Sequence, residues 1–111
     1  MFTVGAQDPE RRRYPRVKAR IPAELTGTGT APIRTVTDEI SLCGCYIETM
    51  FTMDIGTKQC VALSMKDAVI RCIGIVATKY PQVGNGTDFI DMTPNDRLKL
   101  SEYIEECAPE R

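Results

Sequence analysis

The chain has 111 residues, of which 42% are hydrophobic and 26% charged, so it is long enough for one compact domain and too short for two. Its 14 Lys and Arg residues against 15 Asp and Glu give a formal net charge of -1, which excludes recruitment of nucleic acid or an anionic membrane by the field of the whole molecule. The absence of histidine removes the commonest general acid–base group and every histidine-containing zinc site, and this argues against hydrolase and metalloenzyme classes.

The sequence contains no run of about 18 apolar residues, and residues 1–9 lack the basic start and apolar stretch of a signal peptide. We therefore expect a cytoplasmic protein without membrane insertion. The 5 cysteines are odd in number and include no Cys-x-x-Cys pair, which is typical of free thiols in a reduced compartment. A zinc site at Cys43 and Cys45 would need two more thiolates from distant strands, so we expect no metal and treat the cysteines as small core side chains.

Residues 1–10 show no hydrophobic period and predict a flexible N-terminal tail. Residues 11–20 then hold 6 of the 14 positive charges and no acid, a strong local cluster in an otherwise balanced chain. Over residues 17–25 apolar and polar side chains alternate strictly, which predicts a half-buried strand. Pro22 in this run cannot donate a ladder hydrogen bond, so its nitrogen must face outward or the strand must lie at an edge.

Residues 33–40 are rich in β-branched side chains and follow a polar turn, so they predict the hairpin partner of the first strand. Further runs, separated by Gly, Pro, Asn or Lys-Asp turn signals, predict more strands and bring the number to about six. These further runs are residues 45–49, 59–65, 68–79 and 87–92.

Only the C-terminal end has a helical pattern. Thr93, Pro94 and Asp96 supply an N-cap, a proline at the first helical position and an acid in the first turn, and the helix is expected to run to about residue 107. Its apolar positions, at three- and four-residue spacings, are Leu98, Leu100, Tyr103, Ile104 and Cys107. They would cover one end of a sheet, so the sequence predicts an all-β fold: a small six-stranded antiparallel, split β-barrel with a C-terminal α-helix.

Two short motifs flank the first hairpin. Arg12 and Arg16 form an R-x-x-x-R element where the tail meets the first strand, and Glu39, Ser41 and Gly44 form E-x-S-x-x-G at a strand–turn–strand corner. Together they resemble the PilZ domain family, whose members carry R-x-x-x-R followed by (D/N)-x-S-x-x-G on a β-barrel and bind the bacterial second messenger cyclic di-GMP.

The resemblance covers about residues 10–106 and includes the late strand that begins Gly-Thr-Asp-Phe at Gly86. It implies a PilZ-like barrel domain over residues 11–107. It also implies that the motif arginines hold phosphate and guanine. In the second motif, the first residue accepts hydrogen bonds from the N1–H and N2–H edge of guanine, Ser41 offers a hydroxyl, and Gly44 permits close approach to the backbone. Arginine suits this task because its guanidinium can both grip phosphate oxygens and stack on a purine. The expected ligand-binding residues are Arg11, Arg12, Arg16, Glu39, Ser41 and Gly44.

One position departs from the family pattern, because Glu39 stands where the family has Asp or Asn. Its carboxylate lies one carbon–carbon bond, about 1.5 Å, farther from the backbone. A charge-assisted contact is worth about 1.5–3 kcal/mol, so misplacing it would weaken binding about 10- to 150-fold. The preceding Asp38 could compensate only through a register shift or a bulge, since neighbouring strand residues point to opposite faces.

The resemblance to the PilZ family implies a bacterial cyclic di-GMP receptor. We expect this receptor to have no catalytic residue, cofactor or metal and to signal in trans to a separate downstream protein. Ligand phosphates would draw the basic stretch onto the barrel and so reshape one surface. The alternative, motivated by Glu39, is a degenerate PilZ domain that does not bind the ligand and acts as a protein-interaction module. In that case Ser41 and Gly44 simply make a turn, and Glu39 pairs with an arginine on the surface.

Two other classes fit less well. A small nucleic-acid-binding barrel is disfavoured because only 6% of residues are aromatic and no basic stripe continues along the strands, so we expect no DNA or RNA partner. An enzyme comes last, because the visible motifs supply no pair of nucleophile and base.

Overall fold

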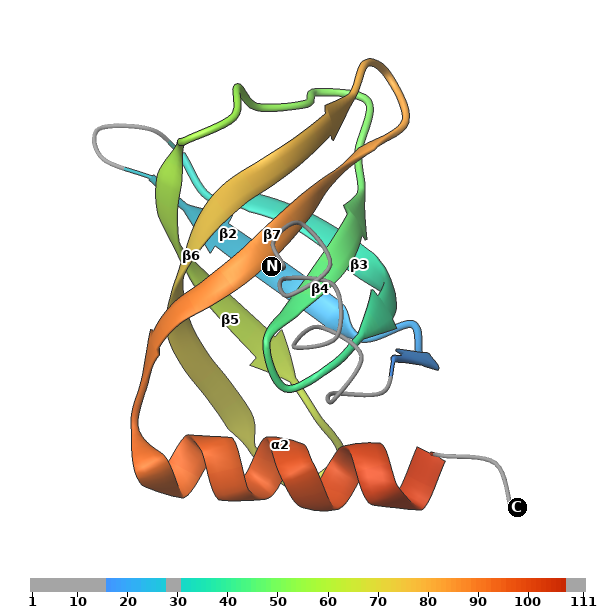
Figure 1. Cartoon of the computed structure of the whole chain (residues 1–111), viewed down its shortest axis with the longest axis vertical. Helices are drawn as coiled ribbons and strands as arrows, with labels where there is room; N and C mark the ends of the chain where they lie inside the picture. The colour runs from blue at the N-terminus through green and yellow to red at the C-terminus, as the bar shows by residue number, and fades with distance from the viewer. Residues whose placement is uncertain (1–15, 28–30, 108–111) are drawn as a thin grey trace, which may run out of the picture.

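The computed structural model of the chain describes residues 16–27 and 31–107, which form seven strands and one helix (Figure 1). The predicted tail, residues 1–10, and the motif residues Arg11 and Arg12 lie outside the described residues. The elements are β1 (Val17–Lys18), β2 (Pro22–Thr26), β3 (Ile33–Ile40), β4 (Gly44–Glu48), β5 (Lys58–Ser64), β6 (Val69–Tyr80), β7 (Gly84–Met92) and α2 (Pro94–Cys107).

Six of the strands close into a barrel. Their order is β3-β2-β5-β6-β7-β4, and a further pairing of β4 with β3 completes the ring. All the strand pairs are antiparallel, and the short β1 is an extra strand that pairs with β3. The structure thus confirms the predicted all-β class and the six-stranded antiparallel barrel with a C-terminal helix.

The strand predicted over residues 17–25 is interrupted in its middle. β1 and β2 lie end to end along β3, but the register shifts by one residue between the pairs Val17–Ile40 and Pro22–Val36. This run therefore holds one residue more than the segment of β3 beside it. Backbone hydrogen bonds lie on both sides of the extra residue: the Ala19 N–H donates to the Asp38 carbonyl, and the Thr37 N–H donates to the Ile21 carbonyl. The alternation itself is correct, because all five apolar positions of this run are buried: Val17, Ala19, Ile21, Ala23 and Leu25.

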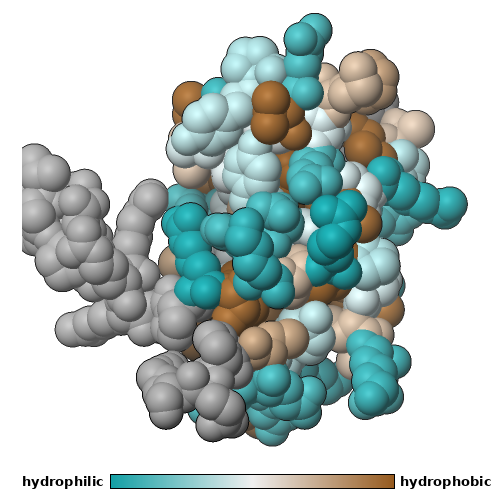
Figure 2. Space-filling model, turned by 90° about the vertical axis from the view of Figure 1, so that its right-hand side faces the viewer, coloured by the Kyte–Doolittle hydropathy of each residue, from teal (hydrophilic) through white to brown (hydrophobic). Residues whose placement is uncertain are grey.

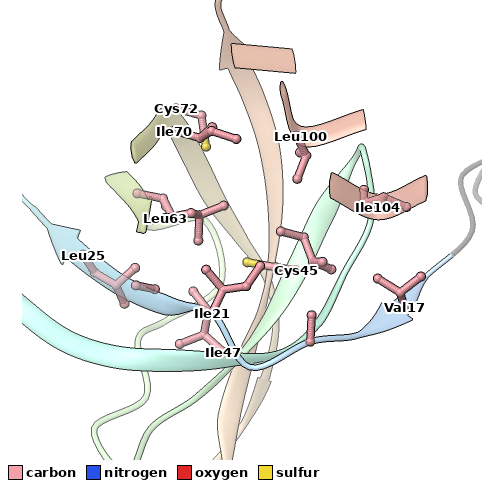
Figure 3. Close-up of a cluster of buried hydrophobic side chains, with 14 residues drawn as sticks. Val17, Ile21, Leu25, Cys45, Ile47, Leu63, Ile70, Cys72, Leu100 and Ile104 are labelled. Carbon is pink, nitrogen blue, oxygen red and sulfur yellow. The ribbon is translucent and has the colours of Figure 1, made fainter. Parts of the chain in front are cut away.

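The barrel interior is filled mainly by aliphatic side chains from strands β1 to β6 and from the helix, as Figure 3 shows, and Phe89 and Met92 of β7 pack against this cluster. Helix α2 lies across one end of the barrel (Figure 1), where it packs on β6 and β1. The Thr93 hydroxyl accepts the Asp96 N–H at 3.1 Å, so the predicted N-cap is confirmed. The Asp96 carboxylate in turn accepts the Arg71 N–H at 3.2 Å and ties the start of the helix to β6.

The inward face of α2 is narrower than the sequence pattern predicted. Leu100 and Ile104 are buried and Tyr103 packs partly against the core, but Leu98 is 58% exposed and Cys107 is also exposed. Leu98 precedes Leu100 by two residues, which is about 200° around a helix of 3.6 residues per turn. It therefore points away from the barrel. Within the described part of the chain, no helix has the length and apolar character needed to cross a membrane.

Candidate functional site

An open hollow of about 210 Å³ lies on the outer face of the barrel, over β4 and β7 and the ends of β3 and β6. It brings together four of the residues predicted from the two motifs, Arg16, Glu39, Ser41 and Gly44. The two motifs are distant in the sequence, and the pairing of β4 with both β3 and β7 places the second motif at the rim of this hollow.

Glycines occupy outward positions on two of the strands that line the hollow, β4 and β7. A Cβ atom at Gly44 would collide with the Thr87 carbonyl oxygen and lie 3.3 Å from the Asp88 Cα. A Cβ atom at Gly86 would collide with the Thr78 hydroxyl. Only glycine allows the neighbouring strands to approach so closely. Gly44 and Gly86 form the floor of the hollow together with the Thr78 side chain, whose hydroxyl accepts the Gly86 N–H at 3.1 Å.

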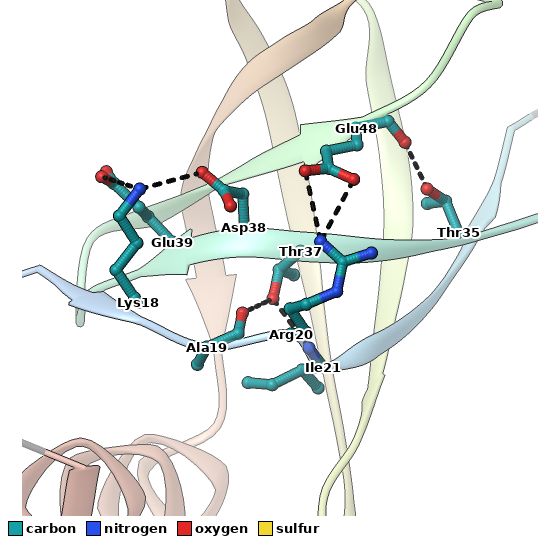
Figure 4. A network of polar contacts seen from close by, with 9 residues as sticks. All are labelled: Lys18, Ala19, Arg20, Ile21, Thr35, Thr37, Asp38, Glu39 and Glu48. Carbon is teal, nitrogen blue, oxygen red and sulfur yellow. Dashed lines mark hydrogen bonds and ion pairs between the residues drawn. The ribbon is translucent and has the colours of Figure 1, made fainter.

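Glu39 is held by two cations. Its carboxylate lies 3.7 Å from Arg16 Nη1 and 3.6 Å from Lys18 Nζ. Lys18 Nζ also lies 3.5 Å from the Asp38 carboxylate, and Figure 4 shows the contacts of Lys18 with both acids. Figure 2 faces the side of the molecule on which β1 and β3 lie in Figure 1, and hydrophilic side chains gather there. Arg16 and Lys18 are 58% and 76% exposed, so each pair contributes little to stability by itself.

A β-bulge places Asp38 beside Glu39. The register of β3 against β4 shifts between Thr37 and Glu39, and the buried residues Thr37 and Ile40 are three positions apart instead of two. Asp38 and Glu39, which lie between them, therefore both face outward. A bulge of this kind is the condition stated above for Asp38 to compensate for Glu39. Glu39 lines the hollow, whereas Asp38 is turned toward Lys18.

Ser41 makes the turn between β3 and β4. It is only 2% exposed, its N–H donates to the Gly44 carbonyl at 2.8 Å, and its hydroxyl accepts the Cys43 N–H at 3.2 Å. The Ser41 hydroxyl is thus engaged in the turn, which agrees with the simpler interpretation of the Ser-x-x-Gly spacing.

Two tyrosines and an aspartate of the hollow were not predicted as site residues. The rings of Tyr46 and Tyr80 have centroids 6.1 Å apart and planes tilted by 53°. Burial, followed by the neighbouring Tyr80, raises the pKa of the Tyr46 phenol, which therefore stays protonated at neutral pH. Tyr80 and Asp88 come from β6 and β7, and they reach the hollow only through the pairing of β4 with β7.

The cysteines have no common site. All five are free thiols, and among the described residues no cluster of His, Cys, Asp and Glu is placed to hold a metal ion. Cys43 and Cys45 both line the hollow, and Cys45 is also buried in the core. Burial raises the pKa of the Cys45 thiol and raises that of Cys72 to about 12, so both are protonated core side chains at neutral pH.

The chemistry of the hollow suits part of a nucleotide. Arg16 offers a planar cation for a phosphate or a purine face, the two tyrosines offer aromatic surface, and Glu39 and Asp88 offer acceptors for N–H groups. Pockets for drug-sized ligands measure about 300–1,000 Å³, so this smaller hollow fits one portion of such a ligand, the size of a base.

Residues 10–106 match the family model of the PilZ domain. No curated protein matches the sequence significantly. Similar solved structures include the Bacillus subtilis inhibitor of motility MotI/DgrA, with a TM-score of 0.75 and 17% identity, over 86% of this chain and 50% of that one. This chain therefore spans half the length of that relative.

Two isolated PilZ domains are also similar. The PilZ domain of YcgR from Escherichia coli, solved with c-di-GMP, has a TM-score of 0.73 and 14% identity, over 87% of this chain and 91% of that one. The PilZ domain of CeSA from a cellulose synthesizing bacterium has a TM-score of 0.66 and 15% identity, over 83% and 96% of the two chains. At these identities the likeness is one of fold.

Proposed function

This chain belongs to the PilZ domain family, and on that premise we propose that it is a receptor for cyclic di-GMP, the ligand present in the structure of the similar E. coli YcgR domain. The observation that carries the proposal is the convergence of both motifs on one hollow. Arg16 of the first motif and Glu39 and Gly44 of the second line the same base-sized space, beside the aromatic pair formed by Tyr46 and Tyr80.

Each of these residues has a chemical role in the proposal. Arg16 binds a phosphate or stacks on a guanine, and Arg11 and Arg12, which lie outside the described residues, supply further cations. Glu39 accepts N–H groups of guanine, and Gly44 lets the ligand approach the backbone. Stacking of a base on an aromatic side chain is worth about 1–3 kcal/mol, so Tyr46 or Tyr80 would add substantially to the affinity.

Binding would also change the surface around the hollow. A ligand phosphate competes with the Glu39 carboxylate for Arg16, because both are anions within reach of the same guanidinium. We propose that the ligand draws the basic residues that precede Arg16 onto the barrel and that a separate protein recognises the new surface, so the receptor acts without catalysis. The five free thiols suit the reduced bacterial cytoplasm in which we place it.

A second function is favoured by one observation. The Glu39 carboxylate is already engaged by Arg16 and Lys18, so it has partners without any ligand. A PilZ domain of this kind can serve as a protein-interaction module that does not bind cyclic di-GMP. In that case, replacing Glu39 by Asp, the residue type of the family motif, is expected to create binding.

Isothermal titration with cyclic di-GMP distinguishes the two functions. We expect the wild type to bind and Arg16→Ala to weaken binding about 10- to 150-fold, because it removes one charge-assisted contact. Arg34→Ala is the matched control: Arg34 is 87% exposed, and its ion pair is with Glu24 on β2. GTP serves as the control nucleotide. A folded wild type that produces no heat at high ligand concentration would exclude the receptor and leave the interaction module.

A further inference from the structure

A second carboxylate borders the hollow, that of Asp88 on β7. Asp88 pairs across the sheet with Gly44 of β4, and it lines the hollow together with Glu39. A Cβ atom built on Gly44 would lie 3.4 Å from Asp88 Oδ1. The Asp88 carboxylate therefore lies close over the backbone of Gly44, at the edge of the floor of the hollow.

The two carboxylates of the hollow differ in their partners. Glu39 faces Arg16 and Lys18 at 3.7 and 3.6 Å. Among residues 16–27 and 31–107, by contrast, no ion pair or side-chain hydrogen bond involves Asp88. Its side chain is also only partly exposed. The acceptor oxygens of Asp88 thus border the hollow without a hydrogen-bond partner among the described residues. A partly buried carboxylate gains most from a partner that donates two hydrogen bonds.

The strands around Asp88 carry two glycines next to its carboxylate. On the outer face, Gly44 lies opposite Asp88 and Tyr46 lies opposite Gly86, so the two glycines occupy one diagonal of a four-residue block. The Tyr46 ring leans away from Asp88, since a Cβ atom on Gly84 would meet its hydroxyl at 2.7 Å. The Tyr46 ring therefore leaves the Asp88 carboxylate open to the hollow, on the side where Gly44 and Gly86 line it.

We propose that Asp88, in place of the Glu39 carboxylate that Arg16 and Lys18 engage, determines base specificity by accepting hydrogen bonds from the N1–H and N2–H groups of a guanine in the hollow. Guanine presents these two donors side by side, and a carboxylate can accept both. Adenine has an unprotonated N1 at the same edge, which repels a carboxylate. The inference rests on the proposed cyclic di-GMP receptor function and adds to it the group that selects guanine over adenine.

The test compares titrations of cyclic di-GMP and cyclic di-AMP into wild type, Asp88→Asn and Asp88→Ala. We expect wild type to prefer the guanine ligand and Asp88→Ala to lose about 10- to 150-fold in affinity for it, without losing affinity for cyclic di-AMP. Asp88→Asn is isosteric, so it preserves the fold, and because its amide keeps only one acceptor oxygen it should lose part of the preference. Asp91→Ala, which removes an exposed acid of the same strand, is the control and should retain it.

The outcomes separate this inference from the proposed function. If wild type binds cyclic di-GMP and both Asp88 variants keep its affinity and base preference, the assignment to Asp88 is wrong and the receptor function stands. The same holds if Glu39→Gln abolishes the preference while Asp88→Asn retains it. If wild type binds neither ligand, the receptor function and this inference both fail.

Discussion

The hydroxyl of Thr37 is fully buried and bridges the break between β1 and β2. It donates to the Ala19 carbonyl at 2.5 Å and accepts the Ile21 N–H at 3.0 Å (Figure 4). The alternation of residues 17–25 predicted which side chains are buried, but it could not predict the extra residue at the break, because that depends on a side chain of another strand. The same limit applies to Asp38, whose bulge is defined by the pairing of β3 with β4.

Thr37→Val tests this role. Valine has the shape of threonine but leaves a buried carbonyl and a buried N–H without partners, at about 1–3 kcal/mol for each unsatisfied group. We therefore expect a clear fall in the urea midpoint of unfolding. Thr26→Val, at an exposed position of β2, is the control and should stay within about 0.5 kcal/mol of wild type. Equal midpoints for the two variants would contradict the bridging role.

At the scale of elements, the boundaries predicted from local pattern were accurate. β3 has the predicted bounds, β4, β5 and β6 are each displaced by one residue, and the helix starts at the predicted cap. β7 begins at Gly84, three residues before the predicted strand, because glycines normally indicate a turn. Here they lie within a strand, since β7 packs closely against the neighbouring strands at these positions.

The two leucines of helix α2 provide a matched test of how it closes the barrel. Leu100 is completely buried, whereas Leu98 is 58% exposed. Leu100→Ala should therefore lower the free energy of unfolding by about 2–5 kcal/mol through lost burial and a cavity. Leu98→Ala should change it by less than about 0.5 kcal/mol, as most surface substitutions do. Chemical denaturation measures both, and similar losses would contradict the observed orientation of the helix.

For the whole molecule, the sequence predicted part of the site. The motif residues Arg16, Glu39 and Gly44 line one hollow, since Arg16 directly precedes β1, which pairs with β3, and Glu39 and Gly44 lie on the paired strands β3 and β4. Tyr80 and Asp88 come from the late β6–β7 hairpin, which reaches the site only because β7 pairs with β4 and so completes the ring. Local pattern carries no information about that closure, so the far wall of the hollow could not be predicted.

The central claim is that cyclic di-GMP binds in the hollow, and amide chemical-shift mapping by NMR during a titration tests it most directly. We predict that the ligand shifts the amides of residues 39–46, 77–80 and 84–88, which border the hollow, and leaves the buried helix residues Leu100 and Ile104 unchanged. A saturating ligand concentration that shifts no amide of a folded sample, or shifts those of α2 and not those of the hollow, would contradict the account.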